Sequence, residues 1–495
     1  MRIAMITEGT YPHQFGGVSV WCDQIIRGMP GYDFHLVALV GTGREQVVWE
    51  LPENVGSLTT IPLWGAPHAP PRTGGQDDFP ARLIRRLVDC LLDPSISSQQ
   101  RFAEVLAALF GYAQQGNLSA ALYSTKAVQI LTKAWQDRWS GTSRPMPTVH
   151  DAVTAMQLLE HCLRPLSHPP VQADVTHVAT NGLGVLPALA AKWQYDTPMV
   201  VSEHGIYLRE QYLHSPNLPY PWAVKALYLG FLRQLCALGY REAEIITPCN
   251  VYNRRWEERL GADPARIRTV YNGVDPANFP VAESEPTQPT ISWAGRIDPI
   301  KDLRTLISAF AIVHQELPHA RLRLFGDPPK GKEPYLARCK ELVSDLGIDD
   351  AVGFEGRTDN VREAYGAGSI VALSSVSEGF PYSLIEAMTC GRTCVATDVG
   401  GVTEAVGDTG LVVPPGSPTR FAEACLTLLR DDELRRKYSA AARARALEFF
   451  TIDGAISKFD EIYSFLAAHD PLPSIPAESA GHEEAENSPT LETAQ

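Results

Sequence analysis

Short apolar runs alternate with longer amphipathic stretches at the start of the chain. Ile3–Thr7, Phe34–Val40 and Thr197–Ser202 are short and largely apolar, as expected for strands buried on both faces of a parallel sheet. Val18–Met29 lies between the first two, follows a pair of glycines and has helical spacing. This alternation predicts a doubly wound α/β domain over residues 1–276.

The pattern changes between about residues 67 and 166. Three stretches there have helical periodicity and are separated by proline and glycine clusters: Phe79–Leu92, Gln100–Gln114 and Ser119–Trp139. We expect a helical insertion in the first domain. Its residues indicate no particular chemistry.

A second α/β alternation follows the segment 277–289, which carries three prolines, has few core residues and reads as a linker. Its expected strands are Thr290–Ala294, Arg321–Phe325, Ile370–Leu373 and Cys394–Thr397, and its expected helices are Leu303–Glu316, Tyr335–Leu346 and Leu384–Cys390. We therefore predict a second doubly wound domain over residues 290–450. A final helix over 451–469 is expected to pack back toward the first domain.

Composition excludes several classes of protein. The net charge is −14, and the tail 470–495 contributes six acidic residues and no Lys or Arg, which argues against nucleic-acid binding. The tail also carries four prolines, and we expect it to be disordered. The nine cysteines form no Cys-x-x-Cys pair, so buried reduced thiols are expected. Met1-Arg2 leads directly into a strand, and no apolar run approaches membrane-spanning length, which predicts a cytoplasmic protein.

Residues 374–391 carry the most specific chemistry in the chain. A strand ends near Leu373, and Pro381 stands where a helix is expected to begin. The free N–H groups around Tyr382–Leu384 would then face a cleft and bind a diphosphate. Glu378 in the loop and Glu386 about one turn into the helix can approach the same ligand from different sides.

Arg296 and Lys301 form a second candidate cluster. They follow the first strand of the second domain, at the edge where open α/β sheets bind ligands. Two cations can balance a pyrophosphate leaving group. No Asp-x-Asp occurs in the chain, so we expect this to happen without a metal.

The first domain offers weaker signals. Gly16-Gly17, between the first strand and its helix, allows a backbone to approach a phosphate closely or forms a plain tight turn. His204 follows a buried strand and is expected at its cleft end, with Glu203 and Arg209 as weaker candidates. The nicotinamide-binding glycine fingerprint is incomplete, because Gln46 stands where its third glycine is required.

Taken together, these residues resemble a family-4 retaining glycosyltransferase of the GT-B fold over about residues 1–465. The resemblance rests on Gly295-Arg296 with Lys301, on Ser377–Pro381 with Glu386, and on Val270–Asp275. In the first domain, Glu8–Pro12 leading to Gly16–Ser19, and Glu203–Tyr207, resemble the Pel-type exopolysaccharide glycosyltransferases. The expected fold is thus two Rossmann-like domains facing a cleft.

The resemblance implies a nucleotide-sugar donor, UDP-glucose, and a saccharide or glycoconjugate acceptor. No cofactor is implied. It also implies a place beside a membrane-bound polysaccharide synthesis complex, at the inner face of the membrane. Arg296 and Lys301 would hold the diphosphate, Glu386 the ribose, and Glu378 and His204 the donor sugar. The other implied donor contacts are Gly16, Gly17, Gly379, Phe380, Pro381, Tyr382, Ser383 and Leu384.

Two other functions remain open at this point. A nucleotide-sugar epimerase would use the same architecture without an acceptor. A catalytically silent scaffold subunit would keep the fold alone.

Overall fold

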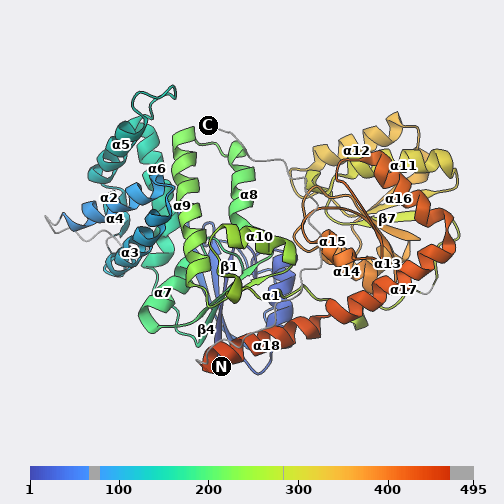
Figure 1. Ribbon diagram of the computed structural model, residues 1–495, viewed down its shortest axis with the longest axis horizontal. Coiled ribbons are helices and arrows are strands. Elements are labelled where there is room, and N and C mark those ends of the chain that lie inside the picture. Colours follow the sequence, from blue (N-terminus) through green and yellow to red (C-terminus); the bar gives the residue numbers. More distant parts are fainter. Residues whose placement is uncertain (66–77, 117, 283, 469–495) are drawn as a thin grey trace.

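The computed structural model describes residues 1–65, 78–116, 118–282 and 284–468. They form two α/β domains side by side (Figure 1), each built on a six-stranded sheet in which every neighbouring pair of strands is parallel. The prediction of a two-domain α/β fold is confirmed. The predicted disorder of the tail from residue 470 lies outside the described residues.

The sheet of the first domain has the order β3-β2-β1-β4-β5-β6. Its strands are β1 (Arg2–Glu8), β2 (Asp33–Val40), β3 (Val55–Pro62), β4 (Val175–Val178), β5 (Met199–Glu203) and β6 (Ile245–Pro248). The helices of its α/β part are α1 (Gly17–Gly28), α7 (Val185–Tyr195), α8 (Tyr207–His214), α9 (Trp222–Glu242) and α10 (Val251–Arg259). The direction in which strands are added reverses between β1 and β4, which creates a switch point where ligands bind in this class of sheet.

The helical insertion stands apart from the sheet and packs on α9 (Figure 1). It comprises α2 (Phe79–Leu92), α3 (Ile96–Ala113), α4 (Leu118–Leu122), α5 (Thr125–Trp139) and α6 (Val149–Leu163). The prediction of one helix over Ser119–Trp139 is wrong. Ser124 has an extended backbone and caps α5, its side chain accepting from the N–H of Ala127 at 3.1 Å, and this cap breaks the helix.

The sheet of the second domain has the order β12-β11-β10-β7-β8-β9. Its strands are β7 (Thr290–Ala294), β8 (Arg321–Phe325), β9 (Val352–Gly356), β10 (Ile370–Leu373), β11 (Cys394–Thr397) and β12 (Leu411–Val413). Its helices are α11 (Leu303–Glu316), α12 (Glu333–Asp345), α13 (Val361–Gly366), α14 (Tyr382–Thr389), α15 (Val402–Val406), α16 (Pro418–Arg430) and α17 (Asp432–Phe449). The switch point of this sheet lies between β7 and β10.

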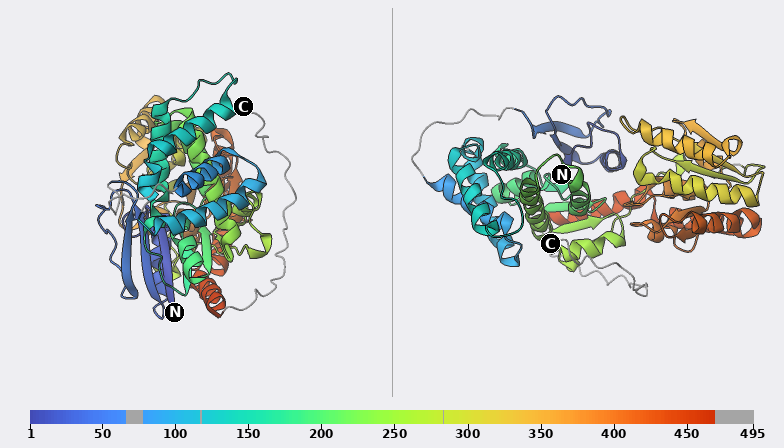
Figure 2. Two further views of the ribbon diagram at one scale, coloured as in Figure 1. Left: turned by 90° about the vertical axis from the view of Figure 1, so that its left-hand side faces the viewer. Right: turned by 90° about the horizontal axis from the view of Figure 1, so that it is seen from above.

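Helix α18 (Ile452–Ala468) leaves the second domain and runs back along the first (Figures 1 and 2). It packs against α1 and β4. Phe459 and Tyr463 are buried in the core of the first domain, and Tyr463 Oη lies 2.5 Å from Nδ1 of His177 in β4. The last described helix is therefore part of the first domain's core.

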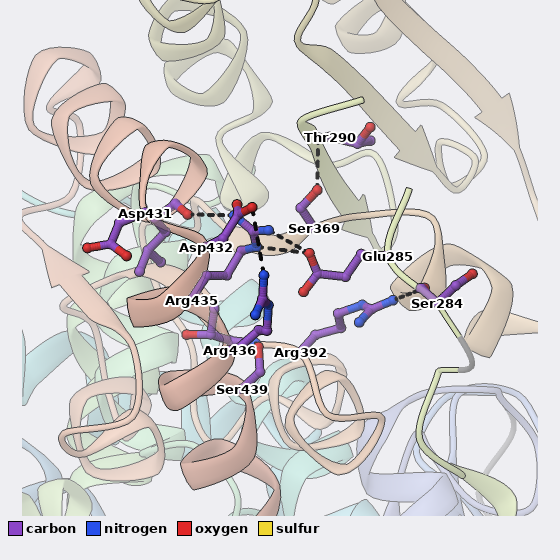
Figure 3. Close-up of polar contacts among 12 residues, drawn as sticks. Ser284, Glu285, Thr290, Ser369, Arg392, Asp431, Asp432, Arg435, Arg436 and Ser439 are labelled. Atoms are coloured by element: carbon purple, nitrogen blue, oxygen red, sulfur yellow. Dashed lines mark hydrogen bonds and ion pairs between the residues drawn. The ribbon is translucent and has the colours of Figure 1, made fainter. Parts of the chain in front are cut away.

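The linker is held by the second domain (Figure 3). Glu285 accepts hydrogen bonds from Nη2 of Arg435 in α17 at 2.6 Å and from its Nε at 3.1 Å. Arg392 donates to the carbonyl oxygen of Ser284 at 2.7 Å. Both arginines are buried, and charged groups form strong hydrogen bonds, so these contacts attach Ser284 and Glu285 to the second domain.

The two passages of the chain between the domains lie next to each other. The N–H of Val274 donates to the carbonyl of Phe450, and the N–H of Ile452 donates to the carbonyl of Val274, both at 2.9 Å. A Cβ on Gly273 would come within 2.4 Å of the Thr451 carbonyl oxygen. Glycine at this position therefore permits the close approach of the two passages.

The nine cysteines are all buried and free, as their spacing predicts. Among the described residues, no helix combines the length and the apolar character needed to cross a membrane.

Candidate active site

The site forms where β7 and β10 lie side by side at the switch point of the second sheet. Arg296 follows β7 and Glu378 follows β10. Although the two residues are far apart in the sequence, both strands end at the same edge of the sheet. This edge faces the first domain, which completes the pocket.

The loops after β7 and β10 are bonded together, and this sets the position of Lys301. The N–H of Val376 donates to the carbonyl of Ile300 at 2.9 Å, and Ser374 Oγ donates to the carbonyl of Lys301 at 2.8 Å. Lys301 Nζ then lies 2.6 Å from Glu378 Oε1, which also accepts from Ser375 Oγ at 2.5 Å. The lysine and the carboxylate are thus oriented before any ligand binds.

A pocket of about 270 Å³ lies between the two domains. Its second-domain wall includes four predicted site residues: Arg296, Lys301, Glu378 and Gly379. Arg296 is exposed, and within the described parts of the chain its side chain makes no hydrogen bond or ion pair. Its charge is therefore available to a ligand, whereas that of Lys301 is already matched by Glu378.

The other predicted donor-binding residues do not line this pocket. Pro381 is the N-cap of α14, with φ −74° and ψ 120°, and Tyr382 is the first helical residue. The prediction that Pro381 occupies the first helical position is wrong by one residue. The Pro381 carbonyl accepts from the N–H of Leu384 at 3.1 Å, so the free N–H groups at this helix start belong to Tyr382 and Ser383.

The side chains of two of these residues, Phe380 and Leu384, belong to the hydrophobic core. Phe380 is buried and its ring lies 5.3 Å from that of Tyr271, and Leu384 is also buried. Any contact of these two residues with a donor would have to use the backbone.

Gly16 and Gly17 lie at the start of α1, opposite α14. A Cβ on Gly17 would be 3.8 Å from the ring of Tyr382, and Tyr382 Oη donates to Oε1 of Gln24 in α1 at 3.2 Å. Gly16 is the N-cap of α1. The glycine pair therefore borders the contact between the domains.

Glu386 lies in the second turn of α14, and its carboxylate accepts from Tyr365 Oη at 2.6 Å. Burial raises its pKa, and the hydrogen bond from Tyr365 opposes this shift. The tyrosine thus fixes the position of one of the two carboxylate oxygens.

His204 lies at the end of β5, one residue before the pocket wall begins at Gly205. Its ring packs edge-on against Trp21, with centroids 4.6 Å apart. Burial lowers its pKa to about 4, opposed by the neighbouring Asn272 side chain. The imidazole is therefore neutral at neutral pH, so it can serve a ligand as a hydrogen-bonding group but not as a charge.

The backbone carbonyl of His204 in the first domain lies so close to Gly379 of the second domain that no side chain fits at position 379. A Cβ on Gly379 would lie 1.9 Å from the His204 carbonyl oxygen. Gly379 thus lets the loop after β10 touch the first domain directly.

Helix α10 is tied to the second domain at its start. Glu404 of α15 accepts from the N–H of Val251 at 2.8 and 3.0 Å, and from Tyr271 Oη at 2.6 Å. Asn250 caps α10 through the N–H of Asn253 and donates to the Gly379 carbonyl at 3.1 Å. A carboxylate at a helix N-terminus also interacts favourably with the helix dipole. These bonds close the pocket on one side.

Replacing Glu404 by alanine is expected to loosen this contact. Hydrogen bonds to a charged acceptor contribute about 1.5–3 kcal/mol, so the backbone amides of residues 250–254 should exchange with deuterium roughly 10- to 100-fold faster. Hydrogen exchange followed by mass spectrometry measures this. Glu423→Ala, which changes an exposed carboxylate on α16, is the control. Unchanged protection of α10 in the Glu404 variant would contradict the role given to this carboxylate.

Three pocket residues on α10 were not predicted from the sequence. Tyr252, Asn253 and Trp256 line the first-domain wall, together with Arg209, which was a weaker candidate. The available signal was a polar and aromatic helix directly after a buried strand. That strand, β6, has only four residues. Among the described residues, no group of three or more His, Cys, Asp or Glu side chains could hold a metal ion.

Comparisons with known proteins agree with this architecture. Residues 288–431 match the family described as Glycosyl transferases group 1, and residues 1–265 match the family described as Domain of unknown function (DUF3492). HepE of Anabaena, solved in complex with UDP and also with UDP-glucose, superposes with a TM-score of 0.60 in the UDP complex. That alignment covers 94% of this chain and 100% of HepE at 16% sequence identity.

Two curated relatives extend the comparison. D-inositol 3-phosphate glycosyltransferase of Salinispora arenicola is 26% identical over 88% of this chain and 97% of its own length. N-acetyl-alpha-D-glucosaminyl L-malate synthase of Bacillus anthracis is 30% identical over 47% of this chain, and the match spans 62% of that protein.

The fold is that of GT-B glycosyltransferases, and the second domain matches the family described as Glycosyl transferases group 1. The match over residues 1–265 covers more than half of the chain, so the chain belongs to the family described as Domain of unknown function (DUF3492).

Proposed function

We propose that this protein is a retaining glycosyltransferase that moves a hexose from a UDP-sugar, UDP-glucose first among them, to a saccharide or glycoconjugate acceptor without a metal. One observation carries the proposal. Arg296, Lys301 and Glu378 gather at the switch point of the second sheet, in a pocket that the first domain completes. This is the edge at which an open α/β sheet binds a nucleotide.

The proposed mechanism depends on the negative charge that develops on the leaving diphosphate. As the bond between the sugar and the diphosphate lengthens, negative charge accumulates on the leaving group. Arg296 and the free N–H groups at the start of α14 would stabilise that charge. Lys301 would add a second positive charge beside the diphosphate. Its ion pair with Glu378 would hold that carboxylate close to the donor sugar.

The acceptor hydroxyl would add from the face that the diphosphate leaves, which gives retention. His204, neutral at neutral pH, would accept or donate a hydrogen bond near the sugar. Closure of the two domains would limit loss of donor to water.

The sequence likeness to Pel-type exopolysaccharide glycosyltransferases supports a polysaccharide as the acceptor, made beside a membrane-bound complex. UDP-glucose is supported by that likeness and by the UDP and UDP-glucose complexes in which HepE was solved.

A donor screen tests the proposal. UDP-, GDP- and ADP-glucose are compared for binding by calorimetry and for slow hydrolysis without acceptor. We expect UDP-glucose to bind in the micromolar range and to hydrolyse fastest, with release of α-glucose. Failure to bind any nucleotide would contradict the proposal and favour a scaffold role. Conversion of UDP-GlcNAc to an epimer without acceptor would favour an epimerase.

A further inference from the structure

The first-domain wall of the pocket carries two aromatic side chains on one face of a helix. Tyr252 and Trp256 are four residues apart on α10, so they lie one above the other. Both line the pocket whose opposite wall holds Arg296, Lys301 and Glu378. The reacting groups of the donor would thus face an aromatic surface.

Arginine side chains hold these rings in place. The guanidinium carbon of Arg255 lies 3.8 Å from the centroid of the Tyr252 ring, and that of Arg259 lies 5.3 Å from the centroid of the Trp256 ring. Such cation–π contacts orient the rings before a ligand binds.

Two buried hydrogen-bond donors in this wall have no partner among the described residues. They are Nε1 of Trp256 and Nδ2 of Asn253. Asn253 lines the pocket and is only 3% exposed. An unpaired buried donor is unfavourable, and a ligand oxygen placed in the pocket would relieve this.

Aromatic rings beside unpaired donors match the chemistry of a sugar. A pyranose ring has a face of C–H groups that packs on an aromatic ring, and its rim of hydroxyl oxygens accepts hydrogen bonds. A nucleobase could also stack on a ring. However, α10 belongs to the first domain, whereas the phosphate-binding groups come from the second.

We propose that Tyr252 and Trp256 form the platform on which a pyranose ring of the acceptor stacks, with Asn253 Nδ2 and Trp256 Nε1 donating to its hydroxyl groups. This rests on the proposed function and assigns an acceptor subsite to it. The bonds from Glu404 and Asn250 tie the start of α10 to the second domain. The platform and the donor groups therefore reach their working distance together.

The experiment uses the full chain with two separate readouts. The first is binding and hydrolysis of UDP-glucose without acceptor. The second is binding of malto-, cello- and chito-oligosaccharides in the presence of UDP, by saturation-transfer NMR, and transfer of glucose to those that bind. The variants are Trp256→Leu, which removes the aromatic face and the N–H, and Trp256→Phe, which keeps a smaller aromatic face and removes the N–H. Tyr252→Leu is a second test should Trp256→Leu fail to fold.

We expect Trp256→Leu to weaken oligosaccharide binding and kcat/KM for the acceptor about 10- to 100-fold. Trp256→Phe should fall in between, with UDP binding and donor hydrolysis within about twofold of the parent in both. Trp64→Leu, an exposed tryptophan outside the pocket, should change neither readout.

Three results would each overturn the proposal. The first is unchanged acceptor kinetics in both the Trp256→Leu and the Tyr252→Leu variants, and the second is that the parent chain binds no oligosaccharide. The third is a loss of UDP binding as large as the loss of oligosaccharide binding, which would mean that the nucleobase stacks on these rings. If the parent chain fails the first readout, the proposed function itself is wrong.

Discussion

Replacing Arg296 by alanine is expected to lower the turnover number about 10²- to 10³-fold, because a fixed group that stabilises transition-state charge contributes on that scale. Arg296 is exposed and has no described side-chain partner, so its removal should leave the fold intact. The Michaelis constant for the donor should change less than the turnover number, since the charge on the diphosphate grows as the sugar leaves.

Steady-state kinetics with the preferred donor of the screen measure this effect, and Arg436→Ala on the exposed face of α17 is a matched control. Lys301→Ala should lose activity on the same scale, but it also leaves Glu378 unpaired. The double variant Lys301→Ala with Glu378→Gln separates the two effects. Wild-type turnover numbers in both single variants, Arg296→Ala and Lys301→Ala, would show that these two cations do not stabilise the leaving diphosphate.

Replacing Glu257 by glutamine is expected to stabilise the protein at neutral pH. Glu257 lies in α10 and is fully buried, and neither of its carboxylate oxygens has a partner among the described residues. Burial raises its pKa to about 8, and the charge of Arg254 opposes this shift. The carboxyl group of Glu203 nearby has its pKa raised as well, chiefly by burial and further by the charge of Glu257.

The direction in which stability changes with pH follows from the number of protons that the folded and the unfolded chain hold. Between about pH 4.5 and pH 8 the folded chain holds a proton on Glu257 that the unfolded chain releases, so stability falls as pH rises through this window. At pH 7 the loss amounts to roughly 3 kcal/mol at most. Glutamine cannot ionise and should remove this loss.

Thermal unfolding at pH 5 and pH 8 measures the difference. The parent should lose more stability than Glu257→Gln between the two pH values, with the variant higher at pH 8. Glu258→Gln, at the next and exposed position of the same helix, should follow the parent. Parallel pH profiles for the parent and Glu257→Gln would show that Glu257 is ionised in the folded chain.

The fold was largely readable from the sequence because strands buried on both faces are apolar throughout. β1, β2, β5, β7, β10 and β11 were found this way. β8, in which Arg321 and Arg323 alternate with buried leucines, was found from the alternation of strands and helices. The strand β4 was not, since two of its four residues are Thr176 and His177. Both are fully buried, and His177 is satisfied by Tyr463 and by Ser202 Oγ. Partners so distant in the sequence leave no local signal.

Some features of the candidate site could be predicted from the sequence, and others depend on tertiary packing. Arg296, Lys301 and Glu378 were predictable because each follows a strand of the second sheet, and the ends of parallel strands share one edge. The pairing of Lys301 with Glu378, the hydrogen bond from Tyr365 to Glu386 and the low pKa of His204 depend on packing. Tyr252 and Trp256 follow β6, a strand that was not predicted from the sequence.

The course of α18 has a consequence for how the protein is made. Phe459 and Tyr463 fill space beside Trp21 and His177 in the first domain, yet a ribosome adds them after the whole second domain. Until then the earlier half of the polypeptide lacks part of its interior and exposes apolar surface to water. The second domain can be completed first, so α18 joins the core of the first domain only after the second domain has been synthesised.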